Sequence, residues 1–122
     1  DWMIPAPAQG AMVVVSMEND PYSTEAVRKL NDKKTEISTH VEREFLQVLE
    51  GGCTAPIGAI ATIHKDSLNF EGVLLSLDGK QKIAVKKSIT TQHYKDFGRT
   101  CAQEILNNGG SEMMVEIKKE LA

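Results

Sequence analysis

Apolar positions recur along the chain with two periods, and the change of period marks the expected elements. The longest helical pattern places five apolar residues on one face: Ile37, Val41, Phe45, Val48 and Leu49. This spacing predicts an amphipathic helix. Gly51-Gly52 ends it, because glycine readily turns left-handed and Pro56 stops the helix from resuming. A shorter helix is expected from Pro21 to about Leu30.

Three segments after Pro56 carry strand-type patterns, over residues 57–64, 68–77 and 81–89. Lys65-Asp66-Ser67 is short enough for a tight connection, and Asp78-Gly79 is a strong hairpin signal. We therefore expect an antiparallel meander. Gly72, inside the second strand, is expected to mark a bulge.

Two further helical patterns complete the chain. The first begins at a cap residue, Thr90 or Thr91, and carries Tyr94, Phe97, Cys101 and Ile105 on one face. Asn107-Asn108-Gly109-Gly110 ends it. Ser111 begins the last helix, whose inward residues are expected to be Met114, Ile117 and Leu121. The predicted class is α+β: a three-stranded antiparallel sheet covered on one face by helices.

The run Ala11 to Val15 predicts another strand, over residues 12–17, for which this chain offers no sheet partner. A strand that is apolar on both faces needs neighbours. We therefore expect an orphan N-terminal strand whose sheet lies in sequence before Asp1, which is not an initiator methionine. An unpaired strand can also join a second copy of itself, which predicts a non-physiological dimer through this segment.

Composition and charge argue against several classes of partner and binding site. The chain has 41% hydrophobic and 25% charged residues, as an ordinary globular domain has, and a net charge of −3 that argues against a nucleic-acid partner. No apolar run is long enough to span a bilayer, and the first residues do not resemble a signal peptide, which predicts a cytoplasmic protein without a membrane partner. Cys53 and Cys101 lack zinc spacing and are expected to be free thiols. His40, His64 and His93 show no metal spacing, so no metal is predicted.

The most distinctive local feature is a thiol in the segment Gly51-Gly52-Cys53-Thr54-Ala55-Pro56. The two glycines leave room for a bulky group to approach the sulfur. Spacing alone is weak evidence, because cysteine often serves as a small buried hydrophobe. A helix C-terminus also raises a thiol pKa, which disfavours a nucleophile in constant turnover.

Three motifs in order resemble those of the porphobilinogen deaminase (hydroxymethylbilane synthase) family. The first is Glu42-Arg43-Glu44-Phe45-Leu46 followed by Leu49-Glu50-Gly51-Gly52-Cys53 and Pro56-Ile57-Gly58. The second is Pro5-Ala6-Pro7-Ala8-Gln9-Gly10-Ala11, and the third is Leu106-Asn107-Asn108-Gly109-Gly110. Together they extend over essentially the whole chain.

The resemblance implies that Cys53 holds a dipyrromethane cofactor through a thioether. On this primer the family's enzyme, a transferase, polymerises four porphobilinogen molecules into hydroxymethylbilane and releases ammonia. Residues 1–20 would end the preceding catalytic domain, residues 21–122 would form the third, cofactor-carrying domain, and Gln9 and Gly10 would border the cleft and bind the cofactor. The family's catalytic aspartate and substrate-binding arginines match nothing here, so no catalytic residue is assigned. The fragment is expected to be inactive without its N-terminal domains.

The remaining charged residues have structural interpretations. Arg28, Arg43 and Arg99 fall on helical segments, where solvated faces and ion pairs are usual, and Arg43 is expected to pair with Glu50 or a backbone carbonyl near Cys53. Lys80, Lys82, Lys86 and Lys87 are typical of a protected edge strand. An alternative to the enzyme remains open: a non-catalytic binding or interaction module of the same fold, with Cys53 as a buried structural thiol.

Overall fold

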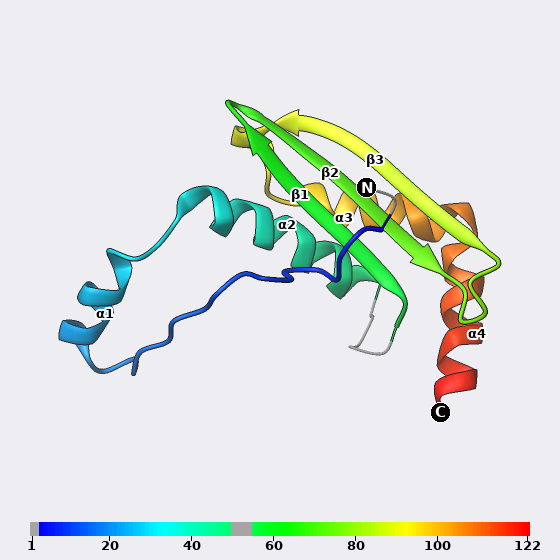
Figure 1. The fold of residues 1–122 in the computed structure, drawn as a ribbon, viewed down its shortest axis with the longest axis horizontal. Coiled ribbons are helices and arrows are strands. Elements are labelled where there is room, and N and C mark those ends of the chain that lie inside the picture. Colours follow the sequence, from blue (N-terminus) through cyan, green and yellow to red (C-terminus); the bar gives the residue numbers. More distant parts are fainter. Residues whose placement is uncertain (1–2, 50–54) are drawn as a thin grey trace.

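The structure, a computed structural model, describes residues 3–49 and 55–122. Its helices are α1 (Pro21–Arg28), α2 (Lys33–Val48), α3 (Phe97–Ile105) and α4 (Ser111–Leu121), and its strands are β1 (Ile57–His64), β2 (Ser67–Leu75) and β3 (Lys82–Thr90). The strands form one antiparallel sheet in the order β1-β2-β3 (Figure 1). The predicted α+β class and the meander are therefore confirmed.

One face of the sheet carries the core. Its inward residues alternate along the strands and include Ile57, Ala59 and Ala61 of β1, Leu68, Phe70 and Leu74 of β2, and Val85 of β3. Helices α2 and α3 pack on each other and cover this face, and Val41, Phe45 and Cys101 are fully buried there. The helix face predicted from the apolar spacing of residues 37–49 is the face that packs.

Gly72 was expected to mark a bulge, and that prediction is wrong. The register runs without a break past this residue, which pairs with Ala59 on one side and Val85 on the other. A Cβ built on Gly72 would lie 2.6 Å from Cζ of Phe45 and 2.8 Å from Cε1 of Phe70. Glycine is present because two aromatic rings occupy the space above it.

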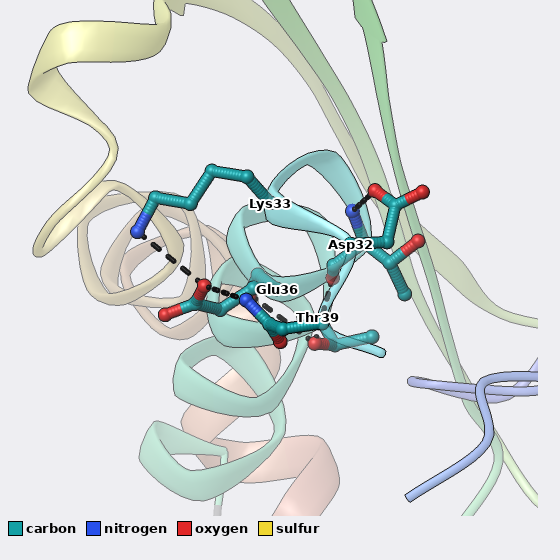
Figure 2. A network of polar contacts seen from close by, with 6 residues as sticks. Asp32, Lys33, Glu36 and Thr39 are labelled. Atoms are coloured by element: carbon teal, nitrogen blue, oxygen red, sulfur yellow. Dashed lines mark hydrogen bonds and ion pairs between the residues drawn. The ribbon is translucent and has the colours of Figure 1, made fainter. Parts of the chain in front are cut away.

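A network of polar contacts lies at the start of helix α2, between residues that are close together in the sequence (Figure 2). Oδ1 of the cap residue Asp32 accepts a hydrogen bond from the Thr35 N–H at 3.1 Å. Glu36 accepts from the Asn31 side-chain amide at 2.8 Å and lies 3.4 Å from the Lys33 ammonium. These two groups hold the pKa of Glu36 below its ordinary value. The network fixes the first turn of the helix.

The predicted N-terminal strand is absent. Residues 11–17 have no regular secondary structure, and Met12 to Val15 are 56–91% exposed. The physical reason is that β-structure requires hydrogen-bonding partners, and β1 pairs with β2 and with residues nearer the N-terminus. The preference of valine for β-structure does not form a strand without such a partner.

The C-terminal half departs from prediction at two helix ends. Thr91–His93 form a short 3₁₀ turn, and α3 begins only at Phe97, because Asp96 has a φ of 63°. In α4, Met113, Met114 and Ile117 are buried, but Leu121 is 49% exposed, so its predicted inward position is wrong. Helix α4 extends away from the sheet, and its last turn has left the core (Figure 1).

Candidate functional site

Cys53 lies outside the described residues, but the structure describes both ends of the segment that carries it. Leu49, just after α2, is only 2% exposed. On the other side, the Ala55 carbonyl accepts from the Ile57 N–H at 2.8 Å, and the Pro56 carbonyl accepts from the Leu75 N–H at 3.0 Å. Segment 50–54 therefore joins two anchored points, the end of a core helix and the start of a core strand.

The second thiol, Cys101, is enclosed in the core. It is 0% exposed, between the helices and the sheet. Burial raises its pKa to about 11, an effect that nearby Glu104 adds to and Lys87 opposes. A thiol without solvent access and with almost no thiolate at neutral pH does not react with an external electrophile. Cys101 thus lies in the core, on the helix face that its apolar spacing predicts.

The N-terminal segment, residues 4–10, contacts β1 at the edge that does not pair with β2. The Pro5 carbonyl accepts a hydrogen bond from the Ala59 N–H at 2.9 Å. The Ile4 carbonyl oxygen would lie 2.8 Å from a Cβ on Gly58. The glycine of the Pro56-Ile57-Gly58 motif thus lets the N-terminal segment approach the strand closely.

Gln9 and Gly10 are exposed in the turn that ends this segment. Gly10 has a φ of 81°, in the left-handed region that favours glycine. Both residues line an open cleft of about 470 Å³ between the N-terminal segment, β1 and the first half of α2, with Ser38, Thr39 and Ile63. Whether this cleft is the one that would hold the cofactor stays a prediction, as does cofactor contact by Gln9 and Gly10.

Glu42 begins the first sequence motif, but no role is predicted for it from the sequence. It is 7% exposed and extends from α2 to the edge of β1. Its Oε1 accepts from the Ala61 N–H at 2.8 Å, and its Oε2 accepts from the Ala8 N–H at 2.6 Å. Burial raises its pKa, against the opposing effects of these two amides and of Arg43.

One signal for Glu42 was available. The helical stripe Ser38, Glu42, Phe45 and Leu49 puts a carboxylate in line with two core residues. A charged residue on a buried stripe needs partners. The identity of those partners, two backbone amides from separate segments, depends on tertiary structure.

The other polar candidates stay at the surface. Arg28 and Arg99 make exposed ion pairs with Glu25 and Asp96, at 3.6 and 3.5 Å, as predicted. Arg43 is exposed, and its expected partner Glu50 lies outside the described residues. His40 lies 2.9 Å from Glu44 within the helix.

Among residues 3–49 and 55–122, no group of three or more His, Cys, Asp or Glu residues is placed to hold a metal. No helix in the same part of the chain has the length and apolar character needed to cross a membrane.

The lysines predicted to protect an edge strand do lie at and on β3, which is an edge of the sheet. Lys86 contacts Glu71 at 2.6 Å, and Lys87 contacts Glu104 at 2.5 Å. These are partly exposed ion pairs that keep the edge polar. They bring no ligand site together.

Comparison of the sequence with known proteins identifies the family of this chain. A family model described as "Porphobilinogen deaminase, C-terminal domain" matches residues 37–107. A porphobilinogen deaminase of Campylobacter jejuni is 38% identical over 93% of the chain, and one of an Exiguobacterium species is 33% identical over 98%. The chain spans 37% and 38% of the lengths of these two relatives. It belongs to the porphobilinogen deaminase family, whose C-terminal domain it contains.

Proposed function

We propose that this chain is the cofactor-carrying C-terminal part of a hydroxymethylbilane synthase. The full-length transferase would join four porphobilinogen molecules into hydroxymethylbilane, with release of ammonia, on a dipyrromethane primer bound to Cys53. Family membership supports this proposal, together with the fact that the relatives are named porphobilinogen deaminases. The fragment alone would be inactive, because the substrate-binding arginines and catalytic aspartate belong to preceding domains.

The assignment of Cys53 as the anchor is supported by the burial and the raised pKa of the second thiol, Cys101. The chain has two cysteines. Cys101 is sealed in the core with a raised pKa of about 11, so it does not trap an electrophilic pyrrole. Cys53 is left as the residue with the right chemistry.

A thioether suits this role. Porphobilinogen becomes an electrophilic azafulvene when ammonia leaves, and the soft sulfur of Cys53 would bond to its methylene carbon. The bound dipyrromethane supplies the pyrrole carbon from which the chain grows. This chain's own contribution would be to hold the anchor on segment 50–54, between the fixed ends Leu49 and Ala55.

The domain assignment is part of the proposal. Residues 1–20 would complete the preceding catalytic domain, and residues 21–122 would form the third domain. Exposure of the apolar residues Met12 to Val15 supports this assignment, because such a segment needs a covering surface that residues 3–49 and 55–122 do not offer it. Gln9 and Gly10 would then border the cleft where the cofactor lies.

Replacement of Cys53 by serine in the full-length protein tests the function. Intact-mass measurement should find a covalent dipyrromethane on the parent and none on Cys53→Ser, with loss of hydroxymethylbilane formation. Cys101→Ala is the matched control and should keep the adduct. If Cys53→Ser still forms product at the parent rate, or if the full-length parent carries no adduct, the assignment is wrong.

A further inference from the structure

The edge of β1 exposes backbone donors that must be satisfied. β1 pairs with β2 on one side, so the N–H groups of alternate residues point away from the sheet on the other side. The Pro5 carbonyl accepts from Ala59, but the next outward amide, Ala61, has no backbone acceptor opposite it and bonds to Oε1 of Glu42. A buried unpaired amide is costly, so this carboxylate replaces a missing strand.

The second oxygen of Glu42 reaches a different segment. It accepts from the Ala8 N–H at 2.6 Å. Among residues 3–49 and 55–122, two hydrogen bonds tie residues 4–10 to the rest of the fold: Ala59 to Pro5 and Ala8 to Glu42. The Glu42 contact is the later of the two along the chain. Beyond it, residues 12–19 are exposed.

We propose that Glu42 is a positioning residue, which clamps the N-terminal segment to β1 and so fixes how the preceding domain joins the cofactor-carrying domain. This role rests on the proposed function, because a junction matters only if a catalytic domain precedes it. Through these two hydrogen bonds, the side chain of Glu42 connects α2 with both β1 and the N-terminal segment. Cys53 follows the far end of the same α2, so a loosened junction would let the anchor move relative to the catalytic groups.

Glu42→Gln is the sharpest test, and it uses the full-length protein loaded with cofactor. Glutamine keeps the size of glutamate but has one acceptor oxygen, so one of the two amides loses its partner. The fold should survive, since burial already favours a neutral side chain at this position. We expect amides in residues 6–11 to exchange with solvent about tenfold faster, the equivalent of about 1.4 kcal/mol, while β2 amides stay unchanged.

The kinetic readout separates positioning from general destabilisation. We expect kcat to fall about tenfold, for the same loss of about 1.4 kcal/mol, with little change in the KM for porphobilinogen. Glu42→Leu, which has no acceptor, should show at least the same loss of protection. Glu112→Gln, the same change at an exposed site on α4, is the control and should leave both readouts unchanged.

Two results would overturn the proposal: unchanged protection of residues 6–11 in folded Glu42→Leu, which has no acceptor oxygen for Ala8, or lost protection with kcat intact. The mass of the covalent adduct separates this failure from failure of the proposed function. Both variants should still carry dipyrromethane on Cys53. A parent without the adduct would refute the cofactor assignment and leave the exchange result as a separate measurement of the clamp.

Discussion

Replacing Gly72 by alanine tests the explanation of this glycine. The added Cβ would lie 2.6 and 2.9 Å from two atoms of the Phe45 ring and 2.8 Å from Phe70. Ordinary contacts begin near 3.4 Å. Both rings are fully buried, with centroids 5.0 Å apart, so neither can turn into solvent to make room. The substitution overpacks the core.

The expected loss of stability is the difference between two effects. Overpacking a core typically costs about 1–3 kcal/mol. Alanine restricts the unfolded chain more than glycine does, which returns about 0.4–1 kcal/mol. The free energy of unfolding should therefore fall by roughly 1–2 kcal/mol. The melting temperature should fall by several degrees.

Urea unfolding followed by circular dichroism measures this change, and a double-mutant cycle identifies its cause. In a Phe45→Leu background the shorter side chain leaves space beside Gly72, so Gly72→Ala should cost less than it does in the parent, with a coupling of about 0.5–3 kcal/mol. An equal cost in both backgrounds would refute the steric explanation. A Gly72→Ala variant as stable as the parent would do the same.

Three further predictions concern the thiols and the N-terminal segment. A thiol reagent added to the native chain should label Cys53 before Cys101, because Cys101 is 0% exposed with a pKa of about 11, and faster labelling of Cys101 would contradict this. The pKa of Cys101 in the folded protein is raised from 9.0, so the contribution of this thiol to stability is complete below pH 9 and is lost as pH rises toward 11. Urea titrations from pH 7 to 10.5 should therefore show the parent losing stability relative to Cys101→Ala. Deletion of residues 1–17 should abolish any dimer seen by sedimentation at high concentration, since the exposed Met12 to Val15 segment is its expected contact, and a dimer that persists without the segment would refute that origin.

Elements whose signals are local can be predicted from the sequence alone. The predicted bounds of β1 match the structure, the packed face of α2 matches its apolar spacing, and Asp78-Gly79 makes the hairpin, with Gly79 at a φ of 71°. The motif around Cys53 and the family were also readable, because motif residues sit at fixed spacing. Each of these depends on neighbours within a few residues or on the turn chemistry of one segment.

Which segments meet depends on the tertiary structure. Local patterns predict a bulge at Gly72, because they do not show that Phe45 and Phe70 occupy the space above it. They also predicted a strand at residues 12–17, for which the described part of the chain holds no pairing partner. Glu42 is the clearest case: its helix position hinted at burial, but its two partners, Ala8 and Ala61, lie 34 and 19 residues away. A buried carboxylate is stable only where donors converge on it, and that convergence is created by the packing of segments distant in the chain.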